Sequence, residues 1–433
     1  MGIAICGKTI GSRVGETRLM SPAAAVVVYG VKAGEGGLGL HAASVLAALG
    51  SGEELVHALG PGRCPTWYLD EEMPILNWHS SPQFVSPWVQ RYTWLRWYQG
   101  HQQLLHDKRL GYWAAAEVEK LRPQQCYVFT QVGLETLRWA KRASVPSVLD
   151  NPNGHIRHFS EVCQRESLRW CDQKHRLHPN QAMVERVEEE YQLADRIRVS
   201  SEWAKISMVS RGVPAGKIHV VALPVNLQRF QPGLAQAPSG GPLRVCYVGS
   251  LNLAKGSQYL MQAAKLLGDN RVTLEFVGAS GNRWTKRLFE RERKGLKLSC
   301  APGDPVAAYQ RAEVLVMPSL HDGFGFVVAE AMACGLPVIV TEDCGAADWI
   351  RDGQSGWIVP AGQVNALVEA LSDALCRRPE LGAMGKLARA DVVRRADPVC
   401  LANLREWVFE KEDPIERRVP NSGGKHVAAS GVS

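Results

Sequence analysis

Short runs of apolar residues alternate along the chain with longer segments in which apolar and polar residues recur at helical spacing. The runs are apolar almost throughout, which is typical of parallel strands covered by helices on both faces. We expect strands at residues 25–31, 55–59, 126–131, 147–149, 196–199 and 218–222 and, in a second group, at 243–248, 273–277, 314–317 and 337–340. This alternation predicts βαβ units and an α/β fold.

The two groups of strands are separated by residues 231–242, QPGLAQAPSGGP, which contain no charged residue and indicate a linker. We therefore expect two doubly wound domains, at 24–230 and 243–396, that bind ligands at the carboxyl ends of their strands. An N-terminal extension (1–23), a C-terminal helix (397–413) that could return to the first domain, and a flexible polar tail (414–433) would complete the chain.

Composition and charge narrow the function. With 433 residues, 45% of them hydrophobic and 21% charged, the chain is an ordinary globular protein and not a disordered one. The net charge of +7 suits anionic small substrates or an anionic membrane surface and does not require nucleic acid. The 11 cysteines form no C-x-x-C pair, which disfavours a zinc site and fits a reduced, cytoplasmic setting. We see no secretory signal and expect no transmembrane helix.

The second domain contains a glycine-rich turn that leads from a strand into a helix. Residues 318–341 are PSLHDGFGFVVAEAMACGLPVIVT, with Asp322 before the turn and Glu330 in the expected helix. Such a turn exposes unpaired backbone N–H groups at the positive end of the helix dipole, which suits phosphate or sugar oxygens. The two acids could hold hydroxyls from two parts of one ligand. Alternatively, Asp322 caps the helix and Glu330 is a solvated helix residue.

A lysine follows the first strand of the same domain. In VCYVGSLNLAKG (245–256) the strand ends at Gly249, and Lys255 precedes Gly256 and a helical pattern. A lysine there can neutralise a diphosphate as a point charge, although an ordinary surface lysine near a helix start would give the same pattern. The two motifs, on successive strand ends, are more specific together than either is alone.

These motifs resemble those of the retaining GT-B glycosyltransferases of glycosyltransferase family four. VGSLNLAKG (248–256) is similar to the family's V-G-R-L-x-x-x-K-G turn, and PSLHDGFGFVVAEAMACGLPVI (318–339) to its P-S-x-x-E-G-F-G-x-x-x-x-E-A-M-A-x-G-x-P-V-I stretch. Residues 343–362 and the region around 191–203 within 188–203 are also similar to the family's sequences, and similarity at 34–50 and 212–232 is weaker. The resemblance covers about residues 24–412. It implies a GT-B fold with two Rossmann-like domains facing a central cleft.

The resemblance also implies a reaction. A sugar would move from a nucleoside-diphosphate donor to a glycan, lipid-linked or small-molecule acceptor, with retention of configuration and without a metal or other cofactor, as in polysaccharide biosynthesis. Lys255, helped by Ser250, would stabilise the departing diphosphate, while Asp322 holds a donor sugar hydroxyl and Glu330 the ribose. The nucleotide base would lie near residues 298–303. The donor site would also include Gly249, Gly323, Phe324, Gly325 and Phe326.

The first domain would add glycines and a histidine to this site. Gly36 and Gly37 match the family's glycine loop, and NPNGHIRHF (151–159) resembles its loop that points a histidine at the donor. We favour His155 over His158 because the family's histidine tends to follow a small residue, here Gly154. A histidine satisfied by the local backbone is the competing interpretation.

Two departures from the family pattern leave other functions open. Asp322 stands where the family usually has Glu, and Ser250 where it often has Arg. A catalytically degenerate scaffold that only binds is therefore one alternative, and another GT-B sugar enzyme, an epimerase or phosphorylase, is a second. An NAD-dependent dehydrogenase is disfavoured because residues 30–39, GVKAGEGGLG, offer no clean G-x-G-x-x-G.

Tryptophan is unusually frequent, and six of the 13 lie between Trp67 and Trp113. Ser86-Pro87 predicts the start of a helix that runs from residue 88 to about 108. Trp94 and Trp97 are candidates for binding the acceptor or for a peripheral contact with the inner face of the membrane. Burial in the core of the first domain is the alternative.

Overall fold

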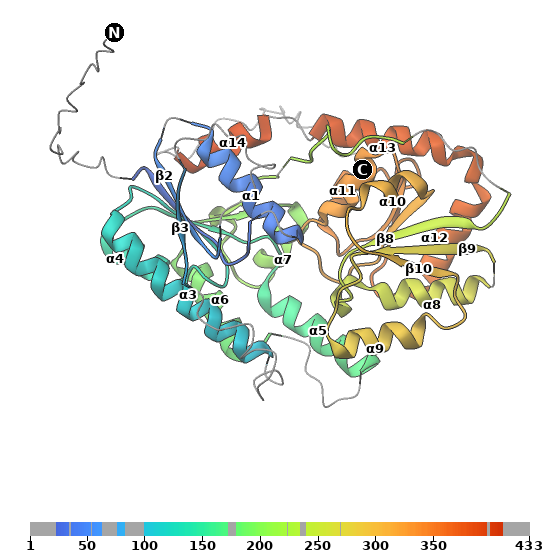
Figure 1. Cartoon of the computed structure of the whole chain (residues 1–433), viewed down its shortest axis with the longest axis horizontal. Helices are drawn as coiled ribbons and strands as arrows, with labels where there is room; N and C mark the ends of the chain where they lie inside the picture. Colours follow the sequence, from blue (N-terminus) through green and yellow to red (C-terminus); the bar gives the residue numbers. More distant parts are fainter. Residues whose placement is uncertain are drawn as a thin grey trace, which may run out of the picture.

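The computed structural model describes residues 23–33, 36–52, 54–62, 76–82, 99–171, 179–222, 224–233, 240–268, 270–395 and 399–409. These residues form two α/β domains, each built around one parallel sheet (Figure 1). The two Rossmann-like domains expected from the sequence are confirmed.

The first sheet has seven parallel strands in the order β3-β2-β1-β4-β5-β6-β7. Residues of the central strands are fully buried, because helices cover both faces of the sheet. The strands are β1 (Ala25–Val28), β2 (Val56–Gly60), β3 (Leu76–Ser80), β4 (Cys126–Phe129), β5 (Ser147–Asp150), β6 (Arg196–Val199) and β7 (Ile218–Val220). The helices are α1 (Gly36–Gly50), α3 (Gln99–Leu121), α4 (Leu134–Ala143), α5 (Ile156–Trp170), α6 (Gln181–Leu193), α7 (Glu202–Val209) and the 3-10 turn η2 (Ala215–Lys217).

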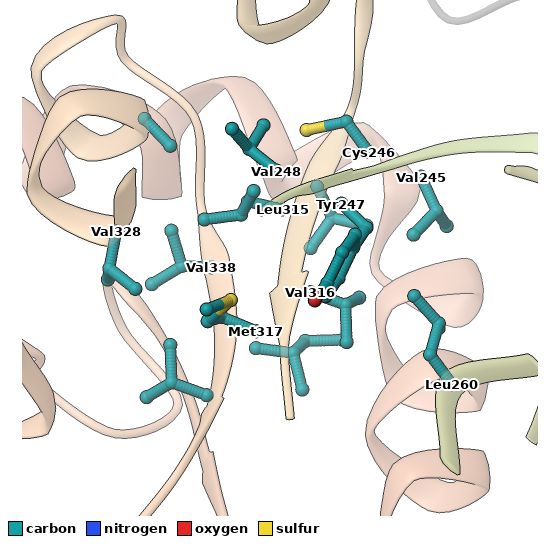
Figure 2. Packing of buried hydrophobic residues seen from close by; sticks show 14 of the residues in the cluster. Val245, Cys246, Tyr247, Val248, Leu260, Leu315, Val316, Met317, Val328 and Val338 are labelled. Atoms are coloured by element: carbon teal, nitrogen blue, oxygen red, sulfur yellow. The ribbon is translucent and has the colours of Figure 1, made fainter. Parts of the chain in front are cut away.

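The second sheet has six parallel strands in the order β10-β9-β8-β11-β12-β13. The strands are β8 (Leu243–Val248), β9 (Val272–Val277), β10 (Leu298–Ala301), β11 (Val314–Met317), β12 (Val338–Thr341) and β13 (Gly356–Val359). The helices are α8 (Ser257–Leu267), α9 (Arg283–Glu292), α10 (Val306–Arg311), α11 (Phe326–Ala333), α12 (Val364–Cys376), α13 (Leu381–Arg395) and α14 (Val399–Phe409), with 3-10 turns η3 (Leu253–Lys255), η4 (Gly345–Trp349) and η5 (Arg378–Glu380). Figure 2 shows side chains of β8 and β11 between Leu260 of α8 and Val328 of α11.

One helix from the sequence of each domain packs against the other domain. Val162 and Cys163 of α5, a helix that follows β5 of the first sheet, are buried in the hydrophobic core of the second domain. In return, α14 lies beside α1 of the first domain (Figure 1), where Leu404 is fully buried. The Arg196 guanidinium of β6 donates to the carbonyl oxygens of Trp407 and Val408 at the end of α14. These exchanges fix how the carboxyl ends of the two sheets approach each other.

Three strands were missed in the sequence, and all three are edge strands: β3, β10 and β13. An edge strand has a neighbour on only one side, so it can carry exposed or polar residues, as β3 (LNWHS) and β10 (LSCA) do. Residues 298–301, near which the nucleotide base was expected, form β10, and binding of the base near the end of this strand remains a prediction.

The helix expected to end near residue 108 instead continues to Leu121. Along this extension a fully buried residue recurs every four positions, at Leu110, Ala114 and Val118. Packing of this face against the core therefore stabilises the continuation of the helix. Trp78 and Trp113 pack against the core of the first domain. Trp94 and Trp97 lie outside the described residues.

Candidate functional site

Lys255 and Asp322 meet where the strand order of the second sheet reverses. β8 and β11 are neighbours, with Val245 paired to Val314, although 65 residues of chain separate the end of one from the start of the other. The segments that follow the two strands therefore emerge at one point, which is where doubly wound sheets bind their ligands. The ammonium Nζ of Lys255 lies 2.5 Å from Oδ2 of Asp322.

This ion pair is partly shielded from solvent. The Asp322 side chain is 8% exposed and that of Lys255 29%. Asp322 is held in place by its own backbone, since its N–H donates to Asp343 and its carbonyl oxygen accepts from Gly345. Asp322 is not the cap of α11, because the residue at that position is Gly325, and no side chain caps the helix there. The alternative of a capping aspartate is therefore wrong. Lys255 lies near the start of α8, as its alternative supposed, but it is paired with Asp322 and only partly exposed.

Two glycines make the close approach of these loops possible. Gly256 follows Lys255 with φ of +73°, and a Cβ there would lie 1.8 Å from the carbonyl oxygen of Pro318. Gly325 precedes α11 with φ of +80°, and a Cβ there would lie 2.7 Å from Sγ of Cys344. Side chains at these positions would push the lysine loop away from β11 and displace the start of α11.

The start of α11 offers hydrogen-bond donors beside the ion pair. The first N–H groups of a helix, here from Phe326 onward, have no partners within the helix, and its dipole favours an anion at this end. The first turn of α11 contains no acidic side chain that would compete for them. Gly249, with φ of +151°, directly follows β8, and Ser250 after it is exposed. Among the expected donor residues, Asp322 is the one that contacts the Lys255 ammonium directly, and the binding of a donor by the others remains a prediction.

Glu330 lies one turn into α11 and is buried, at 8% exposure, so the alternative of a solvated helix residue is wrong. Its Oε2 accepts a hydrogen bond of 3.0 Å from the phenol of Tyr309 on α10. Burial raises the pKa of Glu330 to about 7, although the Tyr309 hydrogen bond acts in the opposite direction. The sequence carried no signal for Tyr309, which occupies an ordinary helical position.

The glycine turn also forms the contact between the domains. A Cβ on Gly323 would lie 2.0 Å from the carbonyl oxygen of Pro152, so the loop after β5 lies directly on this turn. The Ser201 hydroxyl, at the N-cap of α7, donates to the Gly323 carbonyl oxygen at 2.6 Å. Nearby, the Trp203 indole N–H donates to Asp343 at 3.2 Å. The first domain therefore abuts the residues expected to bind the donor.

His155 belongs to this junction but already has a structural role. It is the N-cap of α5, and its Nδ1 accepts a hydrogen bond from the backbone N–H of Arg157 at 3.1 Å. Burial lowers its pKa to about 4, so the ring is neutral at pH 7. The local backbone thus occupies one ring nitrogen, as the competing interpretation supposed, and its role at the donor remains a prediction.

A second histidine at the junction was not singled out in the sequence. His321 immediately precedes Asp322, is 2% exposed, and is packed against the rings of His158, Phe159 and Trp203 from the first domain. Both of its ring nitrogens are buried without a hydrogen-bond partner. Burial lowers its pKa well below the usual value, and His158 and Lys255 lower it further. Its place inside the glycine-turn motif was the available signal.

The start of α1 approaches the same junction from the first domain. α1 begins at Gly36-Gly37, and the ring of His41 in this helix lies 6.0 Å from that of Phe326. His41 is hydrogen-bonded to the buried Asp150, which also accepts from Tyr127 and Arg198. Burial raises the pKa of Asp150, but the contacts with His41 and Arg198 outweigh it and bring the pKa to about 2. This network fixes the carboxyl end of β5 under α1.

The family comparison decides the assignment of the second domain. Residues 235–391 match the model described as "Glycosyl transferases group 1". This match covers the second domain. Among curated relatives, a D-inositol 3-phosphate glycosyltransferase of Corynebacterium urealyticum is 29% identical over 259 residues, covering 53% of this chain and 61% of the relative. One of Streptomyces bingchenggensis is 34% identical over 191 residues, covering 39% and 42%. The matched part of the chain thus spans less than two thirds of the length of these relatives.

Solved structures extend the likeness to both domains. Sucrose-phosphate synthase from Thermosynechococcus elongatus superposes with a TM-score of 0.68 at 20% identity, covering 89% of this chain and 97% of that one. Anabaena HepE in complex with UDP-glucose gives 0.63 at 16% identity, covering 89% and 97%. At such identities the likeness establishes the fold, and the expected GT-B architecture and the resemblance to GT-B glycosyltransferases are confirmed.

Two further features concern the described part of the chain. Within it, no helix is both long and apolar enough to cross a lipid bilayer. Within the same residues, no three or more His, Cys, Asp or Glu side chains are grouped so that they could hold a metal ion.

Proposed function

We propose that the chain is a glycosyltransferase that moves a sugar from a nucleoside-diphosphate donor to an acceptor, with retention of anomeric configuration. The observation that carries this proposal is the Lys255–Asp322 ion pair beside the start of α11, at the strand reversal of the second sheet. A fixed cation next to free helix N–H groups suits a leaving diphosphate, whose charge grows in the transition state. The family of the second domain supports the same reading.

Each expected residue has a defined task in this reaction. Lys255 neutralises the diphosphate, and the N–H groups of Phe324, Gly325 and Phe326 bind its oxygens and the sugar. Oδ2 of Asp322 is engaged by Lys255, so Oδ1 is the oxygen left to accept a sugar hydroxyl. No metal or other cofactor takes part, because Lys255 and the helix dipole supply the positive charge.

The first domain would contribute the acceptor side. Gly36 and Gly37 at the start of α1 and His155 at the start of α5 approach the donor from across the domain junction. The departing phosphate accepts the proton of the acceptor hydroxyl, so the first domain needs to supply no nucleophile. The acceptor is a sugar, a lipid-linked glycan or a small molecule, and peripheral contact with a membrane would accompany a lipid-linked one.

The choice of donor can be tested directly. HepE, one of the structural neighbours, is described in complex with UDP and with UDP-glucose, so UDP sugars are the first donors to test. GDP and ADP sugars follow. We expect one donor class to raise the melting temperature and to release nucleotide slowly by hydrolysis. A donor at 100 times its Kd would stabilise the fold by about 2.7 kcal/mol.

A catalytically degenerate scaffold is the competing function, supported by Asp322 and Ser250 in place of the family's usual Glu and Arg. The intact ion pair argues against it, because the shorter carboxylate still reaches Lys255. A scaffold would bind a nucleotide sugar without releasing nucleotide from it. A lysine-bound pyridoxal phosphate, detected by its absorbance, would instead indicate a phosphorylase.

A further inference from the structure

Glu330 and Tyr309 form a buried polar pair behind the proposed donor site. The Tyr309 phenol, 1% exposed on α10, donates to Glu330 Oε2 at 3.0 Å, and Glu330 is 8% exposed on α11. A buried hydroxyl or carboxylate without a partner costs free energy, so each group satisfies the other. If Tyr309 only filled the core, a phenylalanine would do so without the polar atom.

The charges around Glu330 do not neutralise it. Arg229, just before the linker at residues 231–242, attracts it, but Arg229 is itself paired with Asp304 at 3.1 Å. Asp304, just before α10, repels Glu330, and the buried thiol of Cys334, the C-cap residue of α11, lies close by. Among the described residues, Tyr309 is the side chain that hydrogen-bonds to the Glu330 carboxylate.

We propose that Tyr309 is a positioning residue for the ribose of the donor nucleotide: its phenol holds one oxygen of Glu330, which leaves the other oxygen to accept a ribose hydroxyl. This inference rests on the proposed function. To that function the inference adds Tyr309, which lies outside both sequence motifs on α10, the helix between β10 and β11. Tyr309 acts through Glu330 and does not itself touch the nucleotide.

The pair makes nucleotide binding depend on pH. Burial raises the pKa of Glu330 to about 7, so near neutral pH the carboxyl group is protonated in part of the molecules. A ribose hydroxyl that donates to the carboxylate favours its ionised form, so binding lowers this pKa and releases a proton. Affinity therefore rises with pH until Glu330 is ionised in the free protein, and levels off above that.

Replacing Tyr309 with phenylalanine should move this pH dependence. The phenol favours the charged carboxylate, so its loss raises the pKa of Glu330 in the free protein by about one unit. Tyr309→Phe should then bind nucleotide roughly five- to tenfold more weakly at pH 7 and within about twofold of the wild type at pH 9. A purely structural role for Tyr309 would weaken binding equally at both pH values.

The experiment is isothermal titration calorimetry on the full chain between pH 6 and pH 9. The probes are UDP, GDP and ADP, with the tightest binder also used as its 2′,3′-dideoxy form. Glu330→Gln lacks the titrating carboxyl group and should keep only the shallow pH dependence that the second ionisation of the nucleotide's terminal phosphate causes at about pH 6. Tyr127→Phe is the matched control, because it also removes a buried phenol bonded to a carboxylate, Asp150, but in the first domain. It should keep the wild-type profile.

The outcomes separate this inference from the function on which it rests. A shift of the affinity profile toward higher pH in Tyr309→Phe, smaller with the dideoxy nucleotide, supports the inference. A Tyr309→Phe profile parallel to the wild type overturns it and leaves the proposed function standing. So does a Glu330→Gln profile that rises with pH as the wild type does. If none of the three nucleotides binds the wild type at any pH, the proposed function falls and the inference falls with it.

Discussion

The buried imidazole of His321 should make the domain junction sensitive to acid. His321 is 2% exposed, and neither ring nitrogen has a partner, so the folded protein keeps it neutral. Its pKa lies well below 6.5 because burial, His158 and Lys255 all oppose the charge. In the unfolded chain the same residue takes up a proton near pH 6.5. Below about pH 6.5 the unfolded chain gains a proton on His321 that the folded protein does not bind. The free energy of unfolding therefore falls as the pH falls below 6.5 and is almost unaffected by His321 above it.

The size of this effect follows from the unfolded pKa. Protonation of His321 in the unfolded chain alone stabilises that state by about 2 kcal/mol at pH 5 and by only about 0.2 kcal/mol at pH 7. His321→Phe removes the titrating group. The wild type should therefore lose about 2 kcal/mol more stability than the variant between pH 7 and pH 5. Any packing penalty of the larger ring is the same at both pH values and cancels.

The assay is urea unfolding of both proteins at pH 5 and pH 7, followed by tryptophan fluorescence. His106→Gln on α3 provides a control of opposite sign, because a hydrogen bond to the Asp107 carboxylate raises the pKa of His106. That variant should lose stability relative to the wild type at pH 5. Equal losses in the wild type and His321→Phe would show that His321 is protonated in the folded protein, which would refute the closed junction around it.

Two further variants test the donor residues. Lys255→Ala should lower turnover by at least about 100-fold, as the loss of a preorganised charge does, and unchanged initial rates in a folded variant would remove Lys255 from the diphosphate site. His155→Asn keeps an acceptor for the N-cap of α5, whereas His155→Ala should lose about 1 kcal/mol of stability. If His155 contacts the donor, both variants transfer poorly; normal transfer by His155→Asn would leave it only the capping role.

The central strands could be predicted from the sequence, and so could the positions of Lys255 and Asp322 after two strands of the second domain. Their ion pair was not predicted, because it depends on the pairing of β8 with β11. Edge strands such as β10 were not predicted, because their residues are only partly buried and do not form an apolar run. The packing of α5 against the second domain was not predicted either, because the apolar face of a helix does not show which domain covers it.

The chemistry behind the motifs was less accessible. Glu330 was recognised by its spacing from Asp322, but its partner Tyr309 lies on another helix, and only packing brings the two together. His321 is part of the glycine-turn motif, but its burial could not be predicted because it depends on rings contributed by the first domain. His155 was found from the loop that contains it, while its bond to the backbone of Arg157 follows from the turn that the loop adopts.

The most direct test of the proposed function is the release of nucleotide from a panel of UDP, GDP and ADP sugars by the purified chain, with Lys255→Ala measured beside it. We expect release from one donor class by the wild type, faster when an acceptor is added, and a fall of at least about 100-fold in the variant. A folded wild type that binds a nucleotide sugar but releases nucleotide from none of them, with or without acceptors, would contradict glycosyl transfer and leave a binding scaffold.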